Sequence, residues 1–206
     1  TLHGGEIIDE EGRNKPIFYY GESSPVNDVF EALNERNTKN KQNPPFAMLG
    51  LGAGGLAHFA KPGQELLIYE LNPTVIDIAS NPFYFTYLHE AKKRGAKIEI
   101  QSGDARVNIK KAPNNFLQLI VLDTFSSDSI PLHLITKEAL SLYQTKLKDD
   151  GSILFHVTNT YYDLKKPIAK VAQSLGFEAV AREESEVLNQ LKLLSFYSST
   201  YDEMAK

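Results

Sequence analysis

Short apolar runs alternate with segments of helical spacing through most of the chain. The apolar runs have the length and composition of buried strands, and they occupy Ala47–Leu51, Leu66–Glu70, Ile98–Gln101, Leu117–Asp123 and Ser152–Val157. Helical spacing is found between and after them, at Gly54–Ala60, Pro73–Arg94 with a break near Asn81-Pro82, Ala105–Lys111, Lys137–Leu147 and Asp163–Leu175, which Gly176 ends. This alternation favours a sheet of parallel strands covered by helices.

The residues before the first central strand have a different pattern. Extended runs at Glu6–Ile8 and Pro16–Tyr20 flank a polar, turn-rich segment, which predicts a β-hairpin at the amino terminus. The pair Ser24-Pro25 is a typical helix start, and it predicts a helix over Val26–Glu35. The polar segment Thr38–Pro45 predicts a loop that leads into the first central strand.

The end of the chain predicts two more strands. Glu178–Ala181 and Lys192–Ser198 have the pattern of a closing antiparallel hairpin. Such a hairpin, added to a doubly wound parallel sheet, distinguishes the methyltransferase type of fold from that of dinucleotide dehydrogenases. We therefore expect a Rossmann-like α/β fold of the class I methyltransferase type, with strand order 3-2-1-4-5-7-6. Residues 1–22 are predicted to form the amino-terminal hairpin and residues 23–206 a single nucleoside-binding domain.

Composition narrows the classes of partner. The formal net charge of −4, without a block of like charge, argues against nucleic acid and favours a cationic or small neutral ligand. The chain has no cysteine, which excludes disulfides and thiolate metal sites. No apolar run approaches the roughly 20 residues that a membrane span needs. We expect a cytoplasmic protein that binds neither nucleic acid nor a membrane.

A glycine-rich turn follows the first central strand. Gly50, Gly52, Gly54 and Gly55 lie within six positions, and Glu70 ends the next strand 20 residues after Gly50. Glycines let the backbone turn tightly and approach a ligand closely, and a carboxylate at the next strand end accepts hydrogen bonds from both ribose hydroxyls. Strand, glycine turn, helix, strand and acid together predict a nucleoside-binding site.

Two more acids follow predicted parallel strands. Asp104 comes after the third strand and Asp123 ends the fourth, so both are expected at the same sheet edge as Glu70. Each has a structural alternative, because an aspartate also caps helices and turns. Carboxylates repel phosphates, so the set favours a phosphate-free, positively charged nucleoside such as an adenosyl sulfonium. NAD is the alternative ligand, since Gly50, Gly52 and Gly55 match the dinucleotide pattern.

The histidines indicate no metal centre. His3, His58, His89, His133 and His156 lack metal-ligand spacing, so no metal is expected. His133 follows Pro131 in the loop beyond Asp123 and is a candidate to contact the substrate. His156 is interpreted as a hydrogen-bonded residue at the end of its strand. Tyr19 and Tyr20 alternate in a predicted strand, so one side chain faces inward; Tyr20 either lines the pocket or belongs to the core or a dimer interface.

These motifs resemble the spermidine/spermine synthases, the polyamine aminopropyltransferases. The similarity runs from about His3 to Tyr162 and is closest to a divergent bacterial branch. It is carried by Leu2-His3-Gly4, Tyr19-Tyr20-Gly21, Gly50–Gly55, Glu70, Gly103-Asp104-Ala105, the loop Asp123–Leu134 and the segment His156–Leu164.

The resemblance implies a reaction and a set of site residues. A di- or polyamine would attack the aminopropyl group of decarboxylated S-adenosylmethionine, and methylthioadenosine would leave. The resemblance assigns the cofactor to the glycine turn, Glu70, Asp104 and Ala105, and the proton-accepting or positioning role to Asp123. A second acid usually follows three residues later; this chain has Ser126 there, and Asp128 is the candidate substitute.

Two further departures keep other functions open. Ala53 stands where the family usually carries an acid that holds the cofactor's amine. The family's Tyr-His-Glu element and most of its amino-terminal β-domain have no counterpart. A methyltransferase that uses intact S-adenosylmethionine and a non-catalytic nucleoside-binding module therefore remain alternatives. Homo-oligomers of this size are usually two-fold, so a homodimer is expected.

Overall fold

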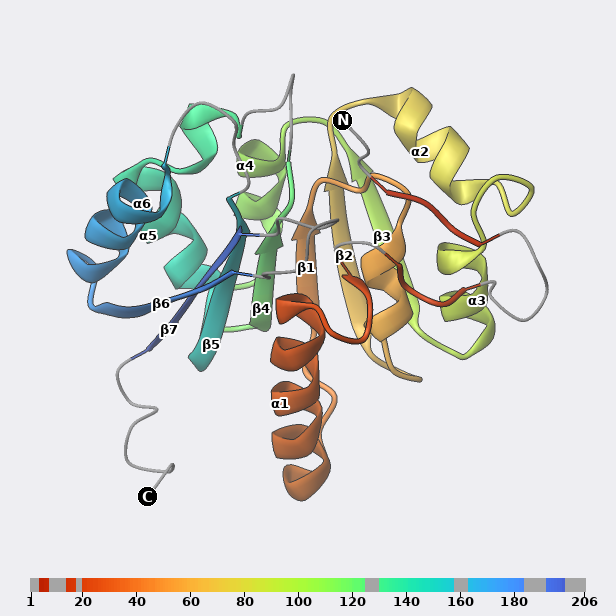
Figure 1. The fold of residues 1–206 in the computed structure, drawn as a ribbon, viewed down its shortest axis with the longest axis horizontal. Helices are drawn as coiled ribbons and strands as arrows, with labels where there is room; N and C mark the ends of the chain where they lie inside the picture. The colour runs from red at the N-terminus through yellow and green to blue at the C-terminus, as the bar shows by residue number, and fades with distance from the viewer. Residues whose placement is uncertain are drawn as a thin grey trace.

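A seven-stranded sheet forms the centre of the molecule (Figure 1). The computed structural model describes residues 4–7, 14–17, 20–124, 130–157, 163–183 and 192–198. The strand order is β3-β2-β1-β4-β5-β7-β6, as predicted from the sequence. The first five strands of that order pair in parallel, and β7 pairs antiparallel with both β5 and β6. The strands are β1 (Phe46–Leu49), β2 (Glu65–Glu70), β3 (Lys97–Ser102), β4 (Leu117–Leu122), β5 (Leu147–His156), β6 (Phe177–Glu183) and β7 (Lys192–Ser198).

Helices cover both faces of the sheet. Figure 1 shows α5 and α6 beside the β6–β7 end, and α2 and α3 beside the β3 end. The α-helices are α1 (Pro25–Asn40), α2 (Pro73–Ser80), α3 (Tyr87–Lys93), α4 (Ala105–Asn108), α5 (Lys137–Lys146) and α6 (Lys165–Gln173). The described part of the chain also has the short 3-10 helices η2 (Gly55–Phe59), η3 (Ile109–Lys111) and η4 (Leu132–Leu134).

The core has two parts, one on each face of the sheet. All four side chains of β1 are buried, and they alternate between the two parts. Ala47 and Leu49 pack with residues of α4, α5 and α6. Phe46 and Met48 pack with residues of α1, η2, α2 and α3. A strand buried on both faces reads as a continuous apolar run, which is why the central strands could be located from the sequence.

Most predicted elements are present, and the two largest boundary errors are the end of α1 and the start of β5. Helix α1 begins at Pro25, with the Ser24 hydroxyl accepting from the Asn27 N–H at 3.1 Å, but it continues to Asn40 instead of ending at Glu35. The polar residue Asn37 is buried there, and its amide exchanges two hydrogen bonds with Gln118, of 2.8 and 2.9 Å. This pair anchors the end of α1 to β4.

The second wrong boundary is the start of β5. The strand begins at Leu147, five residues earlier than predicted, because Leu147 already pairs with Leu117. The register shifts between Leu117 and Leu119, so the polar residues of β5 pass through an irregularity before regular pairing resumes at Ser152. A break in register of this kind interrupts the apolar pattern on which the prediction relied.

The predicted amino-terminal hairpin falls mostly on residues outside the described ranges. Of its described parts, residues 4–7 and 14–17 carry no strand, and both lie against α3. The Tyr87 hydroxyl donates to the carbonyl oxygens of Gly5 and Lys15, at 2.8 and 3.1 Å. The division into residues 1–22 and 23–206 stays a prediction. Among the helices in the described part of the chain, none is long and apolar enough to cross a bilayer.

Candidate functional site

The glycine turn and the three predicted acids all follow strands that end at the same edge of the sheet. Strands β1, β2, β3 and β4 are neighbours and run parallel, so their carboxyl ends lie together at the upper edge in Figure 1. Gly50 follows β1, Glu70 ends β2, Asp104 follows β3 by two residues, and Asp123 directly follows β4. In open α/β sheets this edge is where ligands bind.

The glycine turn is held against the end of β4 and against an aromatic ring. Gly50 has φ of +93°, and a Cβ there would lie 2.3 Å from the carbonyl oxygen of Asp123. A Cβ on Gly55 would lie 2.9 Å from the Tyr20 ring. Both glycines are therefore required by close packing within the protein. The second contact also places the predicted site residue Tyr20 directly beside the turn.

Glu70, at the end of β2, accepts hydrogen bonds from residues that follow both neighbouring strands, β1 and β3. Its Oε2 accepts from the Leu51 N–H at 2.9 Å, and its Oε1 accepts from the Asn72 N–H at 2.8 Å. Its main-chain carbonyl accepts from the Gly103 N–H at 2.9 Å. An ionised carboxylate has about four acceptor positions. Each oxygen of Glu70 therefore keeps an acceptor position beyond the main-chain bond that it receives.

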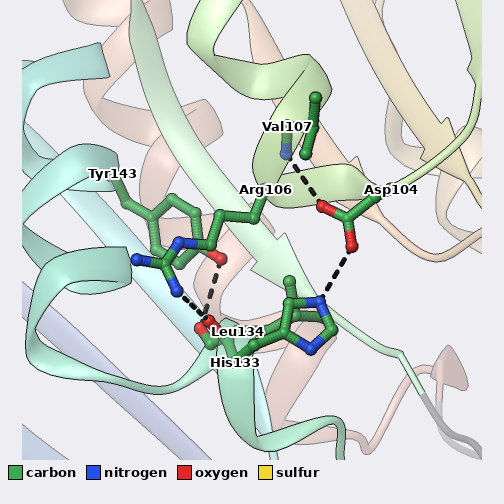
Figure 2. Close-up of polar contacts among 6 residues, drawn as sticks. All are labelled: Asp104, Arg106, Val107, His133, Leu134 and Tyr143. Atoms are coloured by element: carbon green, nitrogen blue, oxygen red, sulfur yellow. Dashed lines mark hydrogen bonds and ion pairs between the residues drawn. The ribbon is translucent and has the colours of Figure 1, made fainter.

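Asp104 caps helix α4 and also contacts a histidine (Figure 2). Its Oδ1 accepts from the Val107 N–H at 2.8 Å, so the capping alternative considered from the sequence is present. Its Oδ2 lies 2.9 Å from Nε2 of His133. The other predicted residue of this segment, Ala105, begins α4, where the first N–H groups of a helix have no partner within it.

Two hydrogen bonds hold η4, which carries His133, against neighbouring helices. Figure 2 shows the Arg106 side chain reaching the His133 carbonyl, to which it donates at 2.8 Å. The Tyr143 hydroxyl donates to the Leu134 carbonyl at 3.1 Å. Burial raises the pKa of Tyr143 well above its ordinary value, so the phenol stays neutral and remains a donor. Helix η4 is thereby fixed beside Asp104.

Asp123 is partly buried and pairs with the buried His156. Its Oδ1 lies 2.7 Å from Nδ1 of His156, and the two side chains are 16% and 7% exposed. The Asp123 N–H donates to the Leu49 carbonyl at 2.9 Å, so its backbone is fixed to β1 as well. The expectation that His156 is a hydrogen-bonded residue at its strand end is confirmed. Its partner was not predicted, although β4 and β5 are parallel neighbours with Leu122 opposite Phe155.

The predicted site residue Asp128 lies outside the described residues, as does Ser126.

Two buried hydroxyls near the edge, those of Tyr69 and Thr124, have no hydrogen-bond partner among the residues the structure describes. Within the same part of the chain, no group of three or more histidine, aspartate or glutamate side chains is arranged to hold a metal ion.

The strand order and the glycine turn define the class of fold: a Rossmann-like fold of the class I methyltransferase type. Human methyltransferase-like protein 13, solved in complex with SAH, superposes with a TM-score of 0.62 at 16% identity, over 84% of this chain and 81% of the other. A probable spermidine synthase from Corynebacterium glutamicum superposes with a TM-score of 0.61 at 18% identity, over 82% and 62% of the two chains. At these identities the superpositions establish the fold alone.

Sequence comparison identifies a more specific relative. A polyamine aminopropyltransferase of Vibrio vulnificus is 33% identical over 119 residues, which are 55% of this chain and 36% of the relative. The match takes in little more than a third of that relative's length. No family model matches the chain. The resemblance to polyamine aminopropyltransferases that the motifs predict is therefore confirmed by sequence, over about half of this chain.

Proposed function

We propose that the protein binds an adenosyl sulfonium and transfers its aminopropyl group to a di- or polyamine. The observation that carries the proposal is the position of Glu70, Asp104 and Asp123, which follow three of four adjacent parallel strands at the edge that also holds the glycine turn. The sequence match to a polyamine aminopropyltransferase supports the same reaction. The co-substrate would be decarboxylated S-adenosylmethionine, and no metal is required.

The nucleoside would be held by Glu70 and Asp104. The acceptor positions that remain on the Glu70 carboxylate suit the two ribose hydroxyls, and Asp104 suits the exocyclic amine of adenine. The N–H of Ala105, in the first turn of α4, is a donor for a ring nitrogen of the base. Gly52 and Gly54 have φ of +53° and +84°, so they let the turn adopt a left-handed backbone conformation that L side chains rarely take.

The charge of the site favours a cationic ligand over a dinucleotide. Three carboxylates at one edge repel a diphosphate, and they attract a sulfonium and the ammonium groups of a polyamine. The same carboxylates hold two cations close together that would otherwise repel each other. This charge argument is the reason for preferring an adenosyl sulfonium to NAD.

Transfer itself needs mainly alignment and removal of one proton. The amine nitrogen attacks the carbon next to sulfur, the carbon–sulfur bond breaks, and neutral methylthioadenosine leaves without acid assistance. The attacking nitrogen ends with one proton too many, which Asp123 accepts or passes to water. We assign Tyr20, whose ring lies beside Gly55, to the wall of the acceptor site. Asp128 stays the candidate substitute for the second acid of the family.

The test is turnover with a panel of acceptors. The protein is incubated with decarboxylated S-adenosylmethionine and putrescine, cadaverine, spermidine or spermine, and methylthioadenosine is measured by chromatography. We expect product with at least one amine, and a loss of about hundredfold or more in kcat for Asp123→Asn. The matched control is Asp77→Asn, on helix α2. Absence of methylthioadenosine with every amine would overturn the proposal.

Ala53 supports a second candidate, a methyltransferase that uses intact S-adenosylmethionine. Alanine stands where an acid would repel the carboxylate of the methionine tail, so the intact cofactor meets less repulsion here. Calorimetric titration with both nucleotides separates the two candidates. Tighter binding of the decarboxylated form supports aminopropyl transfer, and tighter binding of intact S-adenosylmethionine supports methyl transfer. Tight binding of either nucleotide without any turnover indicates a non-catalytic module.

A further inference from the structure

His156 and Asp123 are brought together by strand pairing. Leu122 of β4 is opposite Phe155 of β5, so the next residue of each strand lies at the same edge. There the imidazole Nδ1 is 2.7 Å from the Asp123 Oδ1. His156 is 6% exposed, so bulk water has little access to compete for this contact. Asp123 is thus held twice, by its main-chain N–H and by one carboxylate oxygen.

The chemistry of the contact fixes where the imidazole carries its proton. An ionised carboxylate only accepts hydrogen bonds, so Nδ1 of His156 must be the donor. A neutral His156 is therefore the Nδ1–H tautomer, and Oδ1 of Asp123 is the oxygen that receives its proton. The carboxylate cannot rotate without breaking this bond, which the buried His156 cannot replace with a bond to water at low cost.

We propose that His156 is a positioning residue for Asp123: by holding Oδ1 it orients Oδ2 toward the amine that attacks the sulfonium. This inference rests on the proposed function. The proton lost by the amine goes to Oδ2, the new carbon–nitrogen bond replaces the carbon–sulfur bond, and His156 keeps its Nδ1 proton throughout. His156 contributes orientation, so its removal should lower kcat and leave the binding of both substrates nearly unchanged.

The substitution His156→Asn keeps a hydrogen-bond donor for Asp123 and removes the imidazole ring, so it tests the two contributions separately. The side-chain NH₂ of asparagine reaches about the position of Nδ1 and donates to a carboxylate, whereas leucine fills similar space without a donor. We expect His156→Leu to lower kcat about hundredfold with both KM values within about twofold, and His156→Asn to recover at least about tenfold of that loss. His89→Leu, at an exposed histidine of α3, is the matched control and should match the wild type. Equal kcat in the wild type and His156→Leu would overturn the inference.

A second arm does not depend on turnover. The ¹⁵N spectrum of the imidazoles, recorded at a pH at which His156 is neutral, should show His156 as the Nδ1–H form, and Asp123→Ala should shift its tautomer balance toward Nε2–H. An Nε2–H tautomer in the wild type would overturn the inference. If the wild type turns over no amine, the proposed function fails and this spectrum alone decides whether His156 orients Asp123. If turnover occurs and His156→Leu is unaffected, only the inference fails.

Discussion

Gly50 and Asp123 are in such close contact that no side chain fits between them. A Cβ at position 50 would lie 2.3 Å from the carbonyl oxygen of Asp123 and 2.9 Å from its carbonyl carbon. The first glycine of the turn therefore has a structural role that does not depend on ligand binding. It allows the end of β1 to approach the end of β4, and so it fixes where Asp123 is presented.

Replacing Gly50 by alanine should therefore cost more than replacing a glycine in open space. Gly50→Ala should lower the free energy of unfolding by about 3 kcal/mol, from backbone strain at positive φ plus the overlap with Asp123. Gly63 also has a positive φ, of +77°, but nothing lies within 4 Å of a Cβ there, so Gly63→Ala should cost only about 1 kcal/mol. Urea unfolding of both variants measures the difference. Equal losses would contradict the proposed overlap.

Glu70 should be required for nucleoside binding because it supports the turn as well as the ribose. In Glu70→Gln one side-chain oxygen is replaced by an NH₂ group, which faces a main-chain N–H that needs an acceptor. We expect affinity for methylthioadenosine to fall at least about tenfold, the equivalent of one charge-assisted hydrogen bond. Calorimetry measures it, with Glu65→Gln at the opposite end of β2 as control. Equal affinity in Glu70→Gln and the wild type would exclude Glu70 from the site.

The Tyr69 hydroxyl should lower the stability of the fold. It is buried without a hydrogen-bond partner among the described residues, and burial raises its pKa to about 12, so it is a neutral, unsatisfied group. Tyr69→Phe removes that group and keeps the ring, and we expect it to raise the free energy of unfolding by about 1 kcal/mol. Tyr143→Phe is the control, because the Tyr143 hydroxyl donates to Leu134 and its loss should destabilise. A destabilised Tyr69→Phe would show that the hydroxyl has a partner.

His58 should make stability depend on pH. Burial lowers its pKa below the ordinary 6.5, and Arg94 and Lys61 lower it further, despite the bond between Nδ1 and the Asn14 carbonyl. The unfolded chain therefore binds more protons near pH 6.5, and the folded chain loses stability as pH falls through that range. His58→Asn keeps a donor for the carbonyl but does not titrate. The free energy of unfolding, measured at several values between about pH 5 and pH 7, should change less steeply with pH in the variant than in the wild type. An unchanged slope would contradict the prediction.

The sheet could be predicted because its central strands are buried on both faces. Every residue of Leu117–Leu122 is buried, which produces an apolar run that only Gln118 interrupts. The end of α1 could not be predicted, because Asn37 is polar and its partner Gln118 is 81 residues away. The local sequence pattern cannot show that the side-chain amide of a distant residue will provide hydrogen bonds to the buried amide of Asn37. The result is a helix that ends five residues later than its composition indicates.

The same distinction applies to the site. Glu70, Asp104 and Asp123 could be identified because acids at the ends of parallel strands meet at one edge. The group that pairs with each acid could not be identified from the sequence, because it depends on strand register and on the position of neighbouring segments. Pairing of Asp123 with His156 requires the register of β4 on β5, which shifts between Leu117 and Leu119. The His133 contact to Asp104 depends on the course of the loop that carries η4.

The nucleoside site can be located by a crystal structure with methylthioadenosine. We expect one nucleoside at the carboxyl edge of β1–β4, with its ribose hydroxyls on the Glu70 carboxylate, its base amine at Asp104 and its sulfur toward Asp123. A nucleoside bound elsewhere, or an empty edge at saturating concentration, would contradict this expectation.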